Sequence, residues 1–328
     1  MRFLLDDEQR EFARSLDAML TAADTPELVR AWGAGDHGPG RALWARLAGA
    51  GVFALAVPET YEGVGPLPVE LAVAFAELGR HVVPGPVVET VAAGVLLSRV
   101  GGPAAREWLP RLASGAAPVT LCLGDGVFAL DADAVDAVFA VSGDELRLAA
   151  GHGPLHVSSD PARRLFRAEP GGQLLASGPR VVEAAAAAAD WAAFATAAQA
   201  LGTGEALLRA TVEYVKQRTQ FGVAIGSFQA VKHRLADTLT GLEFARPLLY
   251  GAALALAEEA PRAGADVAAA KVTAGEAAHA AARAALQLHG AVGYTEELDL
   301  SLWLRKARPL RDAWGAPGAC RERVVAGG

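Results

Sequence analysis

One short stretch of the chain, residues 214–237, carries three side chains suited to a ligand that has both a charge and a ring. It reads YVKQRTQFGVAIGSFQAVKHRLAD. Arg218 offers a planar fork of N–H donors that matches a diphosphate. Phe221 can pack against a ring system, and Gln229 can hydrogen-bond one. Binding of such a ligand is therefore one interpretation of this stretch.

The same stretch is expected to join two helices. It has the pattern of a helix end, a break at Phe221-Gly222 and a new helix near Ser227, which is the predicted N-cap. On spacing alone, an ordinary helical hairpin whose charged residues face water is favoured, because such hairpins are common in helical proteins. Both interpretations remain open at this point.

A second glycine-bearing segment, residues 287–295, follows a long helical pattern and reads QLHGAVGYT. Gly290 and Gly293 let the backbone approach a ligand without a Cβ in the way, and Gln287 offers a donor and an acceptor to an adenine edge. A glycine helix stop followed by a turn explains the same residues. The two explanations are compatible.

Two other patterns predict no site. Residues 33–38 match Gly-x-Gly-x-x-Gly, but residues 28–32 have a helical pattern where a dinucleotide-binding loop needs a preceding strand, so a polar helix–helix loop is expected. His152 and His156 have a metal-like interval but sit on a Gly-Pro loop with no third ligand type nearby. No metal site is expected.

Composition narrows the class of protein. The chain has 328 residues, of which 52% are hydrophobic, and a formal net charge of −7, which argues against a broad nucleic-acid or anionic-membrane surface. Cys122 and Cys320 form no disulfide or metal pattern. The first residues, MRFLLDDEQR, turn acidic too soon for a signal peptide, and the apolar run near residues 87–100 is too short to span a bilayer. A cytoplasmic protein without membrane insertion is expected.

Hydrophobic periodicity predicts a mainly helical protein with a small β-domain in three parts: a helical domain (1–116), a reduced middle β-domain (117–180) and a C-terminal helical bundle (181–328). In the first part, helices are expected after Asp6 and near residues 26–32, 41–50, 67–78, 87–97 and 104–112. Strands are expected at 119–123, 127–130, 135–141, 145–149 and 155–157. The bundle helices are expected at 182–216, 228–260, 265–289 and 298–310, with alanine-rich faces that permit close packing and oligomer interfaces.

Three blocks, in order along the chain, resemble the flavin-dependent acyl-CoA dehydrogenases. They are Val57-Pro-Glu59 with Gly63, Gly65 and Glu77-Leu-Gly79-Arg80; Arg218-Thr-Gln-Phe-Gly222 with Ile225, Phe228-Gln229, His233 and Leu235-Ala-Asp237; and Gln287-Leu-His-Gly-Ala-Val-Gly-Tyr-Thr295 with Arg305. The resemblance implies that family's fold: an N-terminal helical domain, a middle β-domain and a C-terminal four-helix bundle that drives oligomerisation.

The resemblance also implies FAD as cofactor and names its contacts. Carried over position by position, they are Arg218, Phe221, Gln229, Gln287, His289, Gly290 and Ala291. The first three would reach FAD from a neighbouring subunit, and the others would line its ADP half. Ala291 replaces the family's usual second glycine. The family's Thr-Glu-Pro…Gly-Ser segment, which hydrogen-bonds the flavin ring, has no match.

The family's catalytic base, a glutamate that takes the proton alpha to the thioester carbonyl, is missing. Gapless counting from Gly293-Tyr294 through Arg305 places Trp314 at its usual position, and counting back from Arg218 places Ala192 at the alternative one. Neither side chain can accept a proton.

The missing base leaves three interpretations. The chain resembles the non-catalytic partner in the short α2β2 acyl-CoA dehydrogenases, whose FAD site forms between unlike subunits. Alternatively it is a self-sufficient homo-oligomer with a displaced carboxylate, for which the nearest acids are Asp190, Glu296, Glu297 and Asp312. The third possibility is a flavin-free scaffold that binds a partner dehydrogenase or an acyl carrier.

The resemblance therefore predicts a subunit of an FAD-dependent acyl-CoA dehydrogenase in fatty-acid, sterol side-chain or polyketide-type metabolism. Its substrate would be an acyl thioester of CoA or of a carrier protein. A second dehydrogenase subunit is the expected partner in an α2β2, dimeric or tetrameric assembly. An electron-transfer flavoprotein is a possible electron acceptor.

Overall fold

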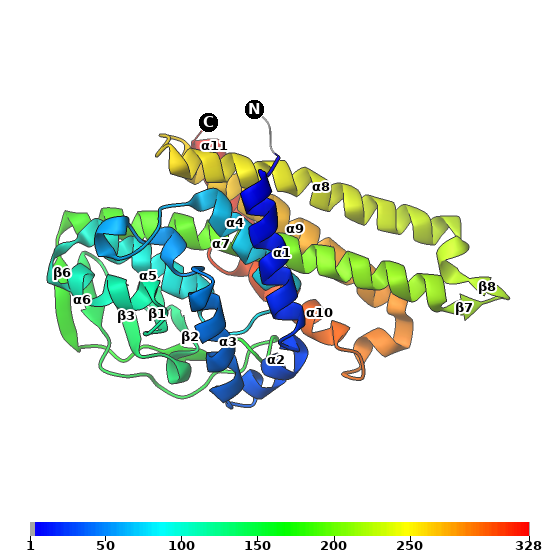
Figure 1. Cartoon of the computed structure of the whole chain (residues 1–328), viewed down its shortest axis with the longest axis horizontal. Helices are drawn as coiled ribbons and strands as arrows, with labels where there is room; N and C mark the ends of the chain where they lie inside the picture. The colour runs from blue at the N-terminus through cyan, green and yellow to red at the C-terminus, as the bar shows by residue number, and fades with distance from the viewer. Residues whose placement is uncertain (1–3, 328) are drawn as a thin grey trace. The chain divides into compact units, whose positions relative to one another are not determined.

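The structure, a computed structural model, describes residues 4–327. Residues 1–3, the start of the segment that was expected not to be a signal peptide, and residue 328 lie outside the described part. The element order is shown in Figure 1. The helices are α1 (Asp7–Thr21), α2 (Thr25–Gly33), α3 (Gly38–Gly49), α4 (Pro68–Arg80), α5 (Val87–Val100), α6 (Gly102–Ala113), α7 (Pro179–Gln217), α8 (Gln229–Ala257), α9 (Ala263–His289), α10 (Leu300–Asp312) and α11 (Pro317–Ala326). The strands are β1 (Val119–Leu123), β2 (Phe128–Leu130), β3 (Ala137–Ser142), β4 (Glu145–Leu148), β5 (Leu165–Arg167), β6 (Gln173–Ser177), β7 (Thr219–Gln220) and β8 (Val223–Ala224).

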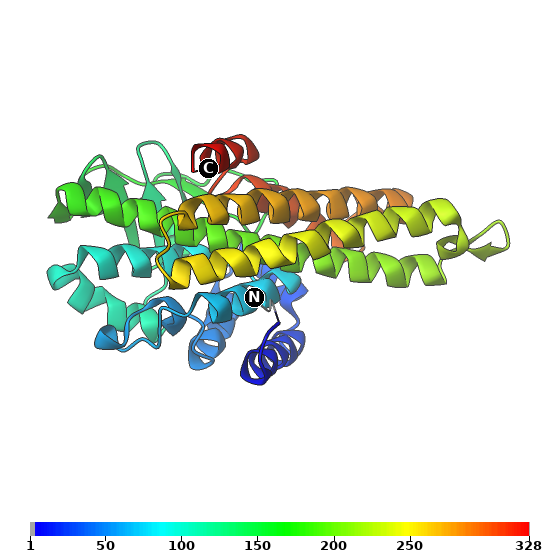
Figure 2. The ribbon, with the colours of Figure 1, turned by 90° about the horizontal axis from the view of Figure 1, so that it is seen from above.

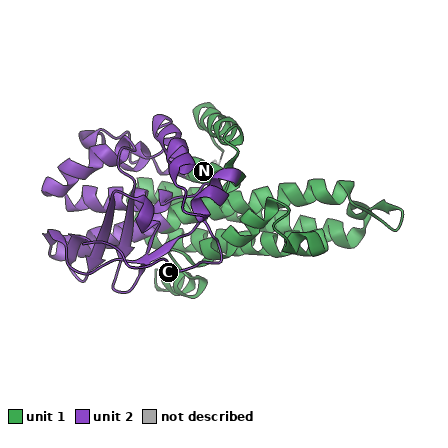
Figure 3. Ribbon diagram, turned by 90° about the horizontal axis from the view of Figure 1, so that it is seen from below, with its two compact units in different colours: residues 1–26, 72–82, 193–328 green, residues 27–71, 83–192 purple. Residues whose placement is uncertain are grey.

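The chain forms two compact units, coloured separately in Figure 3. Unit 1 comprises Met1–Pro26, Ala72–Val82 and Ala193–Gly328, and unit 2 comprises Glu27–Leu71 and Val83–Ala192. The expected boundary at residue 116 falls between α6 and β1, and the one at residue 180 falls in the first turn of α7, just after β6. The mainly helical fold with a small sheet region is confirmed, whereas the three-domain division stays a prediction.

The core of unit 1 is built from small side chains. The helices α8 and α9 run side by side, as Figure 2 shows, and α10 and α11 pack against α9. The buried residues along α8 and α9 are mostly alanines: Ala245, Ala252, Ala253, Ala268, Ala270, Ala274, Ala278 and Ala281. Because alanine adds only a methyl group, the helix axes can approach closely, as the sequence predicted.

Glycines set the crossing of α4 and α7 within unit 1. A Cβ on Gly202 would lie 1.8 Å from the Ala76 carbonyl oxygen, and one on Gly79 would lie 2.0 Å from that of Gln199. The Thr203 hydroxyl donates to the Gly79 carbonyl at 3.1 Å. The two backbones therefore touch at a point where no side chain fits.

A partly buried charge network surrounds this crossing. Arg80 pairs with Glu77 at 3.0 Å and with Glu205 at 2.8 Å, and Arg246 pairs with Glu205 at 2.9 Å. The Trp303 indole N–H donates to the Arg80 carbonyl at 2.8 Å. The segment 77–80, part of the first family block, is thus a structural joint among α4, α7, α8 and α10. Removing one partner of such a network leaves a buried charge uncompensated.

The β-region belongs to unit 2. Its four-stranded sheet has the order β1-β3-β4-β6, with β1 and β3 parallel and the other neighbours antiparallel, and β2 pairs with β5 separately. The helix α5 is almost wholly buried, and its Thr90 hydroxyl donates to the Val119 carbonyl at 2.8 Å. This bond ties α5 to β1.

Some expected elements were wrong or incomplete. Residues 155–157 form no strand: only His156 bridges to Leu165, and Val157 is 91% exposed. The expectation missed β5, β6 and α11, which are short; β6 lies at the edge of the sheet, and all of its residues are exposed or half-buried. Residues 34–37 form the expected helix–helix loop between α2 and α3, with Gly33 as the last residue of α2 and Gly38 as the first of α3.

The long helix α7 passes a length and hydropathy test for a membrane span, but 61% of that window is buried inside the protein. Burial of this kind is typical of a core helix. The absence of membrane insertion stays a prediction.

Candidate functional site

The break predicted at Phe221-Gly222 is a β-hairpin. Helix α7 ends at Gln217, and β7 pairs with β8 around a two-residue turn in which Phe221 has φ +52° and Gly222 has φ +77°. Positive φ at both turn residues is the hairpin geometry that glycine favours and phenylalanine does not. Figures 1 and 2 show this hairpin at the end of the α7–α8 pair.

The predicted N-cap at Ser227 was wrong. Its hydroxyl donates to the Ala224 carbonyl at 2.7 Å, inside a short 3₁₀ turn, and α8 starts after Phe228 without a side-chain cap. Residues 225–227, where the new helix was expected to begin, form the 3₁₀ turn instead.

The hairpin presents Arg218 and Phe221 outward. The Ile225 N–H donates to the Arg218 carbonyl at 2.8 Å, which fixes the backbone, and the Phe221 side chain is 91% exposed. The Phe221 ring meets Phe228 edge-on, with centroids 6.4 Å apart. Within residues 4–327, the Arg218 guanidinium pairs with no carboxylate. An uncovered ring beside an unpaired cation is suited to a ligand or a second chain.

A groove of about 630 Å³ lies elsewhere on unit 1, at the end of α9. It is lined by Arg234, Ala280, Arg283, Leu286, Gln287, Gly290, Ala291 and Tyr294. Three of the predicted cofactor contacts, Gln287, Gly290 and Ala291, therefore share one hollow. The Arg234 guanidinium donates to Gln287 Oε1 at 3.2 Å. Arg218, Phe221 and Gln229 do not line it.

The structure separates His289 from the other predicted contacts. Its side chain is only 6% exposed, its Nδ1–H donates to the Ala285 carbonyl at 2.8 Å, and its ring stacks on Tyr214 at 4.1 Å. Burial lowers the pKa of His289, so the ring is neutral at neutral pH. Two residues along a helix are about 200° around it, so His289 faces the bundle when Gln287 faces the groove.

The sequence analysis did not identify Arg234 and Arg283 as lining residues of this groove. Arg283 lies one helical turn before Gln287, so i, i+4 spacing could have placed it on the same face. Arg234 carried no such signal, because its position depends on how α8 packs against α9.

The groove's donor set fits an anionic nucleotide such as the ADP half of FAD. Two guanidinium groups and an amide line it, and the Tyr294 side chain is 77% exposed. Gly290 has φ +63°, and a Cβ there would meet no atom within 4 Å, so the backbone faces open space. The carboxyl end of α9 carries roughly half a negative charge, which two full positive charges outweigh.

The two expected base positions hold no proton acceptor. Ala192 is fully buried on α7. Trp314 lies in the turn between α10 and α11 with φ +55°. The buried Lys271 ammonium holds that turn by donating to the carbonyls of Leu310, Arg311 and Gly315, at 3.0, 2.9 and 3.2 Å.

The alternative acids show no arrangement that marks one as a base. Glu296 forms an ion pair with Arg305. Glu297 and Asp312 are exposed, and Asp190 is half-buried on α7.

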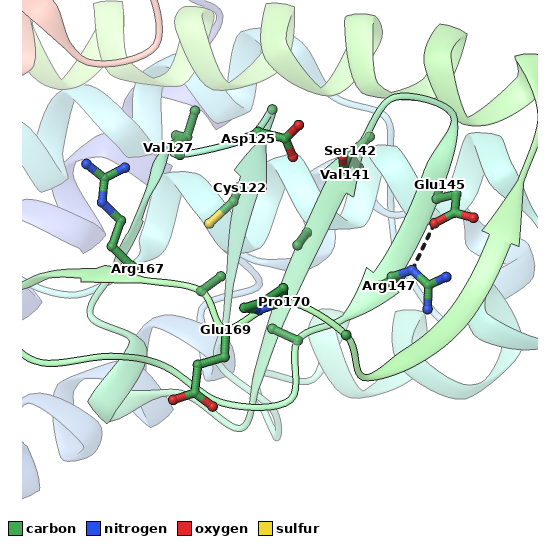
Figure 4. A pocket seen from close by; sticks show the side chains of 16 residues that line it. Cys122, Asp125, Val127, Val141, Ser142, Glu145, Arg147, Arg167, Glu169 and Pro170 are labelled. Carbon is green, nitrogen blue, oxygen red and sulfur yellow. Dashed lines mark hydrogen bonds and ion pairs between the residues drawn. The ribbon is translucent and has the colours of Figure 1, made fainter.

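A second hollow, of about 340 Å³, lies in unit 2 beside the carboxyl end of β1 (Figure 4). Its lining combines Cys122 and alanine side chains with charged residues, of which Glu145 and Arg147 pair at 2.9 Å. The Arg167 guanidinium lies over the Phe128 ring, 3.8 Å from its centroid. Burial raises the pKa of the Cys122 thiol to about 12, so it is not a nucleophile at neutral pH.

Comparison with known families gives a direct assignment. Residues 6–116 match the acyl-CoA dehydrogenase N-terminal domain, and residues 182–326 match the acyl-CoA dehydrogenase C-terminal domain. Acyl-CoA dehydrogenase IpdE2 of Mycobacterium tuberculosis is 36% identical over 308 residues, 92% of this chain and 91% of that relative. The chain belongs to the acyl-CoA dehydrogenase family. IpdE2 of Mycolicibacterium smegmatis is 32% identical over 97% of this chain and 98% of its own length.

Solved structures agree on the fold. The ChsE4-ChsE5 complex from Mycobacterium tuberculosis superposes with a TM-score of 0.85 at 25% identity, covering 99% of this chain and 98% of that one. Butyryl-CoA dehydrogenase from Megasphaera elsdenii gives a TM-score of 0.85 at 21% identity, over 99% of both chains. The predicted family and fold are confirmed, and with them the predicted class of enzyme, an FAD-dependent acyl-CoA dehydrogenase.

Proposed function

We propose that this chain is an FAD-binding, non-catalytic subunit of a hetero-oligomeric acyl-CoA dehydrogenase, and that its partner subunit supplies the catalytic base. One observation carries the proposal: the cofactor-binding blocks are retained, while Trp314 and Ala192 stand at both base positions. Arg218 and Phe221 are both exposed on the hairpin, where a cofactor held by a second chain can reach them.

The reaction removes the proton alpha to a thioester carbonyl, and FAD, when bound, accepts the hydride from the beta carbon. Arg218 of the hairpin and the Gln287 amide of the groove would hold the cofactor through hydrogen bonds, of which those from Arg218 are charge-assisted. Gly290 leaves room for that approach. Trp314 takes no proton, so the alpha proton goes to a carboxylate of the partner subunit.

The relatives support a mixed assembly. One solved relative is a complex of two differently named chains, ChsE4 and ChsE5. Another, with a TM-score of 0.85 at 24% identity, is named a Tcur3481-Tcur3483 steroid acyl-CoA dehydrogenase variant. A steroid-derived acyl-CoA is therefore the substrate class to test first. The expected location of the protein is still the cytoplasm.

The first experiment compares the chain purified alone with the chain co-expressed with a longer family member that carries the glutamate. We expect FAD, seen by its visible absorbance, to co-purify in stoichiometric amount with the mixed complex. A chain that forms no complex and holds no flavin in either preparation would support the scaffold interpretation and refute the proposal. Steady turnover of acyl-CoA by the chain alone would instead support a displaced carboxylate.

A further inference from the structure

We infer that Arg234 and Arg283, which belong to none of the family blocks, form a diphosphate-binding pair in the groove, and that Arg234 also sets the orientation of the Gln287 amide. The inference rests on the proposed function, since it concerns how this chain holds its nucleotide. It adds two residues and a preference for ligands rich in hydrogen-bond acceptors.

The charges in the groove are unbalanced. Arg234, near the start of α8, and Arg283, near the end of α9, both line the hollow and are exposed. In the part of the chain that the structure describes, neither forms an ion pair with a carboxylate, whereas Arg80, Arg246 and Arg305 each do. Two cations that share a hollow without a counter-charge favour an anionic ligand.

The hydrogen bond from Arg234 fixes what Gln287 can offer. A guanidinium has only donors, so it must meet the amide oxygen, and it does so at 3.2 Å. The amide nitrogen, with its two hydrogens, then remains for the ligand. The groove therefore presents guanidinium and amide N–H groups, which match phosphate oxygens and the ring nitrogens of adenine.

A purely structural role for these arginines predicts something different. Arg283 lies within two turns of the α9 carboxyl end, where a cation stabilises the helix dipole. In that case its loss would lower the melting temperature and leave nucleotide binding unchanged. The same argument does not cover Arg234, which lies near the amino end of α8.

The test measures ADP binding by calorimetry, using the full-length chain freed of flavin, alone and in complex with its partner. The variants are Arg234→Met and Arg283→Met, which keep an unbranched side chain and lose the charge, and Arg209→Met, an exposed control on α7 outside the groove. We expect each groove variant to weaken ADP binding at least tenfold and the control to leave it unchanged. Adenosine, which lacks the diphosphate, should bind weakly to all of them.

The orientation of Gln287 is tested by FAD affinity, followed through quenching of flavin fluorescence. Gln287→Glu keeps the acceptor for Arg234 and loses the amide donors, so it should weaken FAD and ADP binding even though the Arg234 contact survives. ADP binding that is unchanged in both arginine variants, or absent from the unaltered protein at millimolar ADP, would overturn the inference. If ADP binding behaves as expected but no preparation binds FAD, the proposed function fails and the diphosphate pair stands.

Discussion

Arg218 is the residue whose removal tests the hairpin most simply. Its guanidinium is exposed and pairs with no described carboxylate, so Arg218→Ala should leave the fold intact while removing a charge-assisted contact to the diphosphate. We expect the FAD content of the purified complex to fall and its dissociation constant to rise about tenfold or more. The measurement is the ratio of visible flavin absorbance to protein.

Lys216→Ala is the matched control for Arg218→Ala. Lys216 lies two residues earlier, is exposed, and pairs with Glu213 at 2.7 Å. It removes the same charge from the same region without touching the hairpin. Equal flavin content in both variants would count against the role assigned to Arg218.

Asp131 gives unit 2 a pH-dependent stability. Burial raises the pKa of its carboxyl to about 7, from an ordinary value of 3.8. Between these values the native state binds the proton more tightly than the unfolded state does, so this group's contribution to stability falls as pH rises. The slope is at most about 1.4 kcal/mol per pH unit.

The measurement for Asp131 is the free energy of unfolding between pH 4 and pH 8. Relative to the unaltered chain, Asp131→Asn should gain stability as pH rises through this window and then level off above about pH 7. Asp125→Asn, an exposed control in the same unit, should show no such trend. A constant difference between Asp131→Asn and the unaltered chain would show that the carboxyl is ionised throughout.

At the scale of elements, Gly202 tests the crossing of α4 and α7. A Cβ there would lie 1.8 Å from a backbone oxygen, so Gly202→Ala must push the helices apart. We expect a loss of about 1–3 kcal/mol or more in the free energy of unfolding. Gly241→Ala on α8 is the control: its Cβ would meet only the Ala277 methyl at 3.8 Å, and alanine should stabilise the helix by about 0.5–1 kcal/mol. Thermal or denaturant unfolding measures the change in the free energy of unfolding for both variants. Equal changes would contradict the close backbone contact between α4 and α7 at Gly202.

The long helices could be predicted from the sequence, because a periodic, alanine-rich run predicts both a helix and the approximate residues at which it begins and ends. The shortest elements could not be predicted: β7 and β8 have two residues each, so the local pattern could not distinguish them from the flanking helices. Short strands such as β5 depend on partners distant in sequence. Their pairing is decided by tertiary contacts rather than by propensity.

The candidate site was predictable in the same uneven way. Motif positions gave Gln287, Gly290 and Ala291, which do share a groove. They could not give the helix rotation that turns His289 inward, nor the packing that brings Arg234 from another helix to Gln287. A motif gives the order of residues along the chain, whereas the lining of the groove depends on the direction in which each side chain points.

At the scale of the whole molecule, the chain combines retained binding groups with an absent base. The hairpin and groove lie on unit 1, and Lys271 holds the turn that bears Trp314 in place through three carbonyls. The turn is therefore fixed by specific hydrogen bonds from a buried side chain. A subunit of this kind depends on a second chain for the proton step.

The most direct measurement is anaerobic bleaching of bound FAD on addition of an acyl-CoA substrate, recorded for the mixed complex and for the chain alone. The account predicts bleaching by the complex, its loss when the partner's base glutamate is changed to glutamine, and its persistence when Trp314 is changed to phenylalanine. It predicts no bleaching by the chain alone. Bleaching by the chain alone would contradict the account, because the proton acceptor would then lie within this polypeptide.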